Sequence, residues 1–395
     1  EGLVPLSAKE GNRYLEIISR AKLRCITMDQ EYNDKGDYTL HWSMLKRVNE
    51  VYAIYKSDLN KVDYTDMVQM FVDQGTAPTL DVLIVDEAQD LTPLQWKQVL
   101  LLKENASRVW YAGDDDQCIH RWNGVDISSF MNASKNKQIL KQSYRVPRAV
   151  YHLANKVVKR IGYRQHKDWK PRDEDGLVDF HMNWYDVNID EGSWTIMART
   201  NRSLNFIHNQ LRDDGYLFER FGRPSLNPAY LQGMDTWSLL ADGKQVSIGS
   251  LREMYDLMPK QGEKALLKRG AKKTFDTVDP EGLYGYEELV AHHGLLASID
   301  TRPETVVNMS REDITYVAAI RRRGEDLLKP RIALSTIHRM KGGEDDNIML
   351  LTESSFPAVN NPDQDDEHRV FYTGITRARH NLHIVDSPAR YRYGI

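Results

Sequence analysis

The sequence predicts an α/β fold with largely parallel strands, because short apolar runs alternate with amphipathic helical stretches. The clearest run, residues 82–85 (VLIV), has charged residues on both sides and is typical of a strand buried on both faces of a parallel sheet. A second run at 109–112 follows a predicted helix at 94–102. The further predicted strands are 177–180, 195–198, 332–335, 348–351 and 382–385.

The segments before and within this α/β pattern are predicted to be helical. In residues 1 to about 75, apolar side chains recur at helical spacing within 14–18 and 44–55, and turn-forming residues at 33–37 interrupt them. Residues 223–330 contain no strong strand run and are predicted to form a mainly helical insertion between two strands.

The composition is that of an ordinary globular protein. The 395 residues include 53 Lys and Arg against 57 Asp and Glu, for a net charge of −4, and 41% are hydrophobic. At roughly 100–200 residues per domain, two to three domains are predicted. No stretch approaches the roughly 20 apolar residues of a membrane helix. The charge argues against coating nucleic acid by bulk attraction, although it is compatible with a local basic channel.

The two cysteines and the first residues bear on where the protein acts. Cys25 and Cys118 cannot form a disulfide framework, which favours a reducing, cytoplasmic location. The chain opens on Glu1 rather than Met and has no signal-peptide pattern, so we expect a processed start or a fragment.

Two adjacent carboxylates, Asp86 and Glu87, directly follow the predicted strand 82–85. Ligands of open α/β sheets bind beyond the carboxyl ends of the strands. There Asp86 would hold Mg²⁺ and Glu87 would orient and deprotonate an attacking water during nucleotide hydrolysis. A solvated acidic turn is the alternative.

A polar segment at 113–124 follows the second predicted strand. Its Gln117 is suited to sensing a γ-phosphate by hydrogen bonding, and Trp122 offers a face on which a base can stack. The alternative is a turn in which Trp122 fills the core.

Three later segments also contain candidate site residues. Arg145 lies in 142–147 (QSYRVP), and a predicted strand runs into a glycine-containing loop at 334–344 (LSTIHRMKGGE). Residues 367–379 have amphipathic helical spacing that would present Arg377 on one face, as an arginine finger for a transferred phosphate. Ordinary surface arginines are the alternative.

These five segments, in this order, resemble motifs II, III, IV, V and VI of the UvrD/Rep group of superfamily 1 DNA helicases, over roughly residues 60–386. The resemblance implies two RecA-like (P-loop NTPase-type) parallel-sheet domains, the first incomplete, with mainly helical insertions. The implied parts are a helical accessory segment (1–74), the C-terminal half of the first RecA-like domain (75–138), the first part of the second (139–222), the helical insertion (223–330) and the second part of the second domain (331–395).

The same resemblance assigns the nucleotide-site roles. Asp86 and Glu87 correspond to the Walker B metal-binding and catalytic carboxylates. Gln117 and Arg145 would contact the γ-phosphate from the two sides of an inter-domain cleft, joined by Arg377.

The remaining roles concern the ribose and DNA. Glu344 would reach the nucleotide ribose. Trp122 would stack on a base of the single strand, with His120 beside it where the family usually has Tyr. Thr336 and His338 resemble DNA-backbone and coupling residues. ATP and Mg²⁺ are the implied cofactors, and single-stranded and duplex DNA the implied partners, with replication or repair proteins as further candidates.

The expected activity is ATP-dependent DNA unwinding, of 3′-to-5′ polarity by resemblance. No G-x-x-x-x-G-K-[ST] loop occurs in the 395 residues, so the chain alone is predicted not to turn over ATP. The alternatives are a non-catalytic DNA-binding or regulatory module, and one half of a split motor. The motor half of a helicase–nuclease is disfavoured, because no nuclease domain follows the last motif.

Two further clusters are interpreted conservatively. His292 and His293 have no third ligand at a suitable spacing, so solvated histidines are favoured over a metal site. The arginines at 321–323 are predicted to form a solvated turn rather than a DNA clamp.

Overall fold

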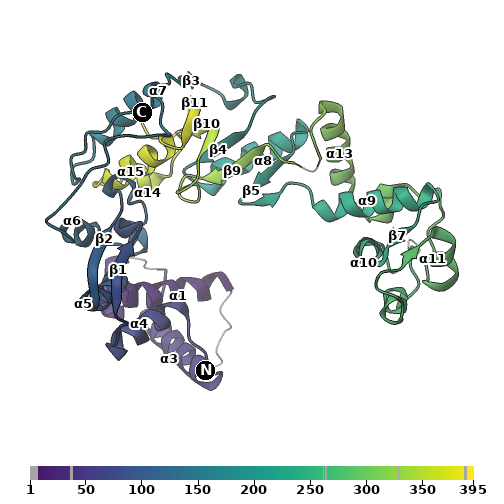
Figure 1. The fold of residues 1–395 in the computed structure, drawn as a ribbon, viewed down its shortest axis with the longest axis horizontal. Helices are drawn as coiled ribbons and strands as arrows, with labels where there is room; N and C mark the ends of the chain where they lie inside the picture. Colours follow the sequence, from purple (N-terminus) through teal and green to yellow (C-terminus); the bar gives the residue numbers. More distant parts are fainter. Residues whose placement is uncertain (1–7, 36–38, 261, 263–264, 328, 387–388) are drawn as a thin grey trace. The chain divides into compact units, whose positions relative to one another are not determined.

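The computed structural model describes residues 8–35, 39–260, 262, 265–327, 329–386 and 389–395. Internal contacts divide the chain into two compact units, each containing α/β structure (Figure 1). Unit 1 comprises Glu1–Gly176, Phe356–Arg377 and Ile395, and unit 2 comprises Leu177–Ser355 and Ala378–Gly394. No helix in the described part of the chain has the length and apolar character needed to cross a membrane.

Unit 1 begins with helices, as the periodicity predicts. They are α1 (Ala8–Leu23), α2 (Met28–Lys35), α3 (Trp42–Asp58) and α4 (Tyr64–Gln74). Tyr14, Ile17 and Leu45 are buried in a core that α1, α2 and α3 share. Of the predicted turn at 33–37, the first three residues instead complete α2, and the other two lie outside the described residues.

The sheet of unit 1 has two parallel strands, β1 (Leu80–Val85) and β2 (Ala106–Tyr111), in register so that Val85 pairs with Tyr111. Between them runs α5 (Pro93–Glu104), which a Thr92–Gln95 capping box begins. The prediction that β1 is buried on both faces is wrong for the described residues, because Ile84 is 69% exposed. Helix α5 packs against this two-stranded sheet and covers one of its faces, so the other face is left exposed.

The rest of unit 1 surrounds the carboxyl ends of these strands. The short elements are η1 (Ala88–Asp90), η2 (Asp115–Gln117), η3 (Arg121–Asn123), α6 (Ile127–Asn132) and α14 (Phe356–Val359). Two longer helices, α7 (Arg148–Val158) and α15 (Asp365–Ile375), pack against each other. Eight of the eleven residues of α15 are buried, so this helix is a core element of unit 1.

Unit 2 is built on a seven-stranded sheet of order β3-β11-β10-β4-β9-β5-β6, in which the β5–β6 pair alone is antiparallel. The strands are β3 (Leu177–His181), β4 (Trp194–Ala198), β5 (Phe218–Arg220), β6 (Arg223–Pro224), β9 (Ile332–Thr336), β10 (Asp345–Leu351) and β11 (Ala378–Val385). The five predicted strands are confirmed. The two missed strands, β5 and β6, are too short to show a periodic pattern.

Helices of unit 2 flank the sheet and fill the predicted insertion. They are η4 (Trp184–Asp186), α8 (Asn201–Asp213), α9 (Pro228–Ala241), α10 (Ile248–Leu257), η5 (Ala271–Thr277), α11 (Tyr286–His292), α12 (Pro303–Val306) and α13 (Arg311–Arg323). A small antiparallel sheet of β7 (Val246–Ser247) and β8 (Leu283–Tyr284) lies among them. The insertion is thus mainly helical, as predicted, with its own core around Trp237, Tyr255 and Phe275.

Candidate functional site

The first two candidate residues, Asp86 and Glu87, follow the last residue of β1 and are both exposed. Glu87 has a left-handed backbone (φ 50°), an uncommon conformation for a residue with a side chain. Its backbone N–H donates to Asp86 Oδ1 at 2.9 Å. The chain therefore turns sharply at the sheet edge and presents both carboxylates there.

A buried amide, Gln89, links the ends of the two strands. Its Nε2 donates to Glu87 Oε2 at 2.5 Å, and its Oε1 accepts from the backbone N–H of Asp114 at 2.9 Å. A Cβ on Gly113 would lie 2.3 Å from that Oε1, so a larger residue there would displace the Gln89 amide. Sequence reasoning missed this role because spacing alone does not reveal which side chain crosses between strands.

Gln117 lies in η2, after β2, and its side-chain amide bonds to one acidic and one basic side chain. Its Nε2 donates to Asp114 Oδ2 at 2.7 Å, and its Oε1 accepts from Arg377 Nη2 at 2.8 Å. The structure thus brings together two of the predicted γ-phosphate residues, which are 260 positions apart in the chain.

Arg377 is 1% exposed, so the alternative of an ordinary surface arginine is wrong. It follows the end of α15 rather than lying on a face of that helix, and its Nε donates to the Thr373 carbonyl at 2.9 Å. Burial, and then the positive charge of Arg145, lower the pKa of Arg377 to about 10. Arg145 and Glu87 belong to the same unit as Arg377, and their charges act on its guanidinium.

An ion-pair network of Asp114, Asp115 and Asp116 with Lys167 and Arg164 lies beside Gln117. Lys167 Nζ contacts all three carboxylates, at 2.7 Å for Asp114 and 2.8 Å for Asp116. Arg164 donates two hydrogen bonds of 2.7 Å to Asp116. Burial opposes the charge on Asp114, but Lys167 and a hydrogen bond from Gln117 hold its pKa below the usual value. Because an ammonium occupies the centre of this acidic cluster, the cluster is not a metal site.

Residues of helix α15 make further hydrogen bonds to the segments that carry this ion-pair network. Arg369, fully buried, donates from Nε to the Asp115 carbonyl at 3.0 Å. Asp365 accepts from the backbone N–H groups of Gly162 and Tyr163 at 2.7 and 2.9 Å. Sequence reasoning missed these contacts, because arginine and aspartate on a polar helix are usually solvated.

Trp122, in η3, is 63% exposed, so it does not fill the core. Its carbonyl accepts from Arg20 Nη1 at 2.8 Å, which fixes the backbone beneath the ring. His120 lies edge-on, with its ring centroid 6.3 Å from that of Trp122. The exposed indole therefore offers a stacking face on a held backbone.

The remaining predicted residues lie in unit 2. Thr336 ends β9, is 9% exposed, and accepts through Oγ1 from the backbone N–H of Arg339 at 3.4 Å. His338 follows in the turn after β9. Glu344 precedes β10 and pairs with Arg379 at 3.4 Å. Because β9 and β10 both run parallel to β4, Thr336 lies at the carboxyl ends of these strands and Glu344 at their opposite ends, so the structure does not bring Glu344 together with Thr336.

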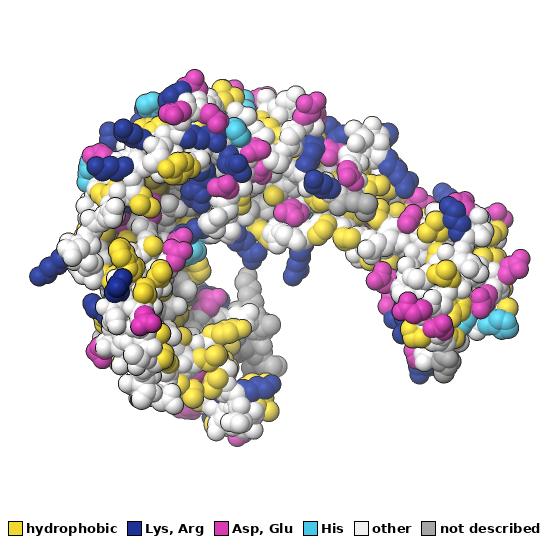
Figure 2. Space-filling model, viewed as in Figure 1, with side chains coloured by type: hydrophobic (Ala, Val, Ile, Leu, Met, Phe, Trp, Pro, Cys, Tyr) yellow, Lys and Arg dark blue, Asp and Glu magenta, His cyan; other side chains and the backbone are white. Residues whose placement is uncertain are grey.

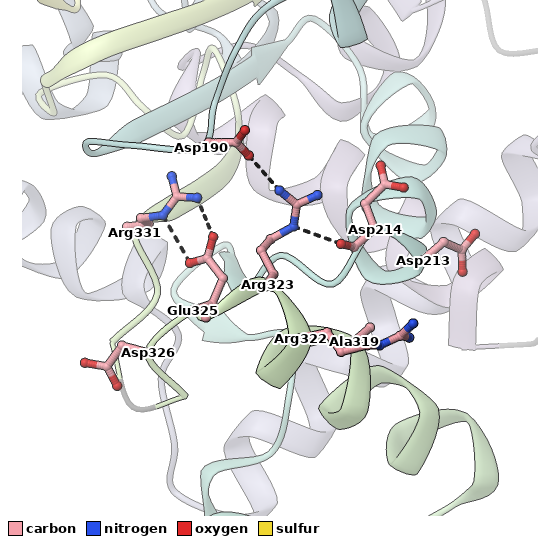
Figure 3. Close-up of a pocket in the computed structure, with 10 residues that line it drawn as sticks. Asp190, Asp213, Asp214, Ala319, Arg322, Arg323, Glu325, Asp326 and Arg331 are labelled. Carbon is pink, nitrogen blue, oxygen red and sulfur yellow. Dashed lines mark hydrogen bonds and ion pairs between the residues drawn. The ribbon is translucent and has the colours of Figure 1, made fainter.

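A charged pocket in unit 2 contains two of the arginines from 321–323 (Figure 3). The prediction of a turn outside a helix is wrong, because these three arginines lie in the last helical turn of α13. Positive charges there interact favourably with the helix dipole. Arg323 pairs with Asp190 at 2.6 Å, and Arg331 pairs with Glu325. The residues lining the pocket include five carboxylates and three arginines, so the pocket is not an anion site.

The prediction of two solvated histidines is wrong for His293, which is 5% exposed. Its ring stacks on Phe275 with centroids 4.6 Å apart, and its Nδ1 bonds with Thr274 Oγ1 at 2.8 Å. His293 is therefore a core residue of the insertion.

Comparisons with known proteins agree with the motif order. The UvrD/REP helicase N-terminal domain matches residues 5–138, and the UvrD-like helicase C-terminal domain matches residues 296–387. ATP-dependent DNA helicase PcrA of Bacillus subtilis is 22% identical over 88% of this chain and 62% of its own length. A probable DNA helicase II homolog of Mycoplasma capricolum is 26% identical over 30% of this chain and 19% of its own. PcrA of Leuconostoc citreum is 30% identical over 28% of this chain and 17% of its own. The chain thus spans about three-fifths of the Bacillus relative.

Proposed function

We propose that this chain, which belongs to the UvrD/Rep helicase family, is the ATP-dependent, DNA-translocating part of a 3′-to-5′ DNA helicase. The supporting observation is the burial of Arg377 beside Arg145, with its guanidinium bonded to Gln117.

Two guanidinium groups close together favour an anion between or beside them. Arg145 makes the charged form of Arg377 less favourable, so an arriving phosphate would relieve that repulsion. Arginine also matches the oxygen geometry of a phosphate better than lysine does. A γ-phosphate bound there would compete for Arg377 and so change the hydrogen bond on Gln117. This is the step by which Gln117 would report that ATP is present.

Asp86 and Glu87 fit the metal and water roles at the end of β1. Exposed carboxylate oxygens are the ligands that Mg²⁺ prefers, so Asp86 would hold the ion. When bound, Mg²⁺ neutralises charge on the transferred phosphoryl group. Glu87 would accept a proton from the attacking water, with its carboxylate oriented by the hydrogen bond that Gln89 donates to Oε2. Glu344 would contact the ribose.

Hydrolysis needs a phosphate-binding loop, which we infer must come from residues outside these 395. Backbone amides of such a loop and its lysine hold the β- and γ-phosphates in P-loop enzymes, and the motif is absent from the sequence. We therefore propose that the chain alone binds ATP weakly and does not hydrolyse it.

Trp122 would stack on a base of the translocated strand, with His120 at its edge, while Thr336 and His338 would contact the DNA backbone and couple it to ATP. The partners would be single-stranded and duplex DNA, together with proteins of replication or repair. A cytoplasmic location is part of the same proposal.

Binding of a fluorescent single-stranded oligonucleotide tests the role of Trp122. Removing one base–aromatic stack costs about 1–3 kcal/mol, so Trp122→Ala should weaken Kd by about 5- to 150-fold. Trp110→Ala is a matched control, because Trp110 is 62% exposed against 63% for Trp122. Equal losses in both variants, or no loss in Trp122→Ala, would count against the stacking role.

A non-catalytic DNA-binding module is the second candidate, favoured by the missing phosphate-binding loop. The two candidates agree on Trp122 and differ on Arg377, which a module without ATP would not need. Supplying the missing loop and measuring ATP hydrolysis separates them.

A further inference from the structure

We propose that Asp179, His181 and His383 form a binding site for a divalent transition-metal ion, Zn²⁺, on the sheet of unit 2. Asp179 and His181 lie on β3, and His383 lies on β11. Asp179 pairs in register with His383, and His181 is two residues further along β3. All three side chains therefore emerge on the same face of the sheet.

The spacing of the ligand atoms suits one small ion. His181 Nε2 lies 3.0 Å from His383 Nδ1 and 3.5 Å from Asp179 Oδ2, and all three ligand atoms lie within 4.8 Å of one another. Zinc bonds to nitrogen and oxygen are about 2.0–2.2 Å long and tetrahedral, which places neighbouring ligand atoms about 3.3 Å apart. Small rotations of the side chains would thus seat the ion.

The surroundings hold the two imidazoles and leave one side open. The ring of Trp194 lies 5.3 Å from that of His383, and Trp194 is itself fixed by a 2.8 Å hydrogen bond from Nε1 to the Glu191 carbonyl. The His181 side chain is 13% exposed, whereas that of Asp179 is 55% exposed. A water molecule can therefore complete the coordination from the Asp179 side.

The donor set selects the class of ion. Two imidazole nitrogens and one carboxylate oxygen suit Zn²⁺ and its first-row neighbours, while Mg²⁺ and Ca²⁺ prefer sites made of oxygen alone. The other acidic cluster, Asp114–Asp116, differs because Lys167 already neutralises it.

Binding of Zn²⁺ would stabilise an edge strand of the sheet. β3 is at one edge of the seven-stranded sheet, with β11 as its neighbour. His181 and His383 are 202 positions apart, so the ion would join the first and last strands of unit 2. Edge strands open more easily than central ones, and a cross-strand metal bond would oppose that opening.

Metal titration of the whole 395-residue chain, first stripped with a chelator, tests the site. Calorimetry should show one saturable Zn²⁺ site, and Co²⁺ in its place should give the intense visible absorption of tetrahedral coordination. His383→Gln and Asp179→Asn should each weaken the Zn²⁺ Kd by at least about tenfold. His166→Gln, a change of an exposed histidine, should leave it unaltered.

Hydrogen exchange provides a readout that does not depend on activity. Zn²⁺ should slow exchange of the β3 amides in the unaltered chain and not in Asp179→Asn, whose exposed side chain can change without unfolding the sheet. Absence of saturable binding, equal binding by all variants, or displacement of Zn²⁺ by Mg²⁺ at similar concentration would overturn the proposal.

Discussion

The two sheets of this protein differ in how they are stabilised. In unit 2, every residue of the central strand β4 is buried, with three strands of the sheet on each side. In unit 1, β1 and β2 pair only with each other among the described residues, and Ile84 and Trp110 are 69% and 62% exposed. Parallel strands are usually buried on both faces.

The difference shows what holds the candidate nucleotide site. In unit 2, an apolar sheet core supports the sequence motifs. In unit 1, the ends of β1 and β2 are held by polar contacts: Gln89 between the strands, and Lys167 among three aspartates. Such networks are strongly destabilised when one member is removed, because the partners keep their burial and lose their charge compensation. Figure 2 shows acidic and basic side chains interspersed on the visible face.

Lys167→Met should have the largest effect on this comparison. It leaves Asp114, Asp115 and Asp116 close together without their shared cation, and should lower the free energy of unfolding of unit 1 by about 3–5 kcal/mol. Pulse-labelling hydrogen exchange in urea reads both units in one sample. Lys97→Met, on the exposed face of α5, is the control and should change little. An equal loss in unit 2 would show that the network does not act locally.

The matched pair Ile196→Ala and Ile84→Ala tests the sheets directly. Ile196, in β4, is fully buried, and its truncation should cost about 2–5 kcal/mol in unit 2. Ile84, in β1, is exposed, and its truncation should cost less than about 1 kcal/mol in unit 1. The same urea experiment measures both. A large loss for Ile84→Ala would mean that something covers this face in solution.

Acidification should lower the stability of unit 1 before that of unit 2. The loss should be smaller than the losses expected from the substitutions above. Burial opposes charge on Asp63, Asp114 and Asp365, yet their hydrogen bonds and cationic neighbours hold each pKa below its usual value. Their contribution to stability is present above the unfolded pKa of about 3.9 and is lost as pH falls through the lower folded pKa. In unit 2, Lys272 lowers the pKa of Asp256, an exposed pair that solvent screens.

Urea midpoints for the two units, measured from neutral pH down to about pH 4 and below, check this order. Burial raises the pKa of Asp366, which acts in the opposite direction and makes the net effect modest. A unit 2 midpoint that falls first would contradict the comparison.

The sequence was sufficient for the α/β class, five strands of the large sheet and the helical insertion, because the strands give compact apolar runs and the helices a clear period. It also identified Gln117 and Arg377, which lie together 2.8 Å apart. It could not reveal the buried roles of Arg369 and Lys167, since polar side chains are ordinarily solvated and their partners are distant in the chain. The sequence drew attention to the adjacent pair His292 and His293 as candidate metal ligands. The histidines that lie close together in the structure, His181 and His383, come from different strands.

We propose that this chain contains the γ-phosphate residues of a DNA-stimulated ATPase and needs a phosphate-binding loop from elsewhere. The most direct test is steady-state ATP hydrolysis with single-stranded DNA, by this chain alone and by the same chain supplied with a P-loop segment of the family. We expect no DNA-stimulated turnover from the chain alone, and turnover on addition of the segment that Glu87→Gln and Arg377→Ala abolish. Robust Glu87-dependent hydrolysis by the chain alone would contradict the claim, as would turnover in the completed protein that survives Arg377→Ala.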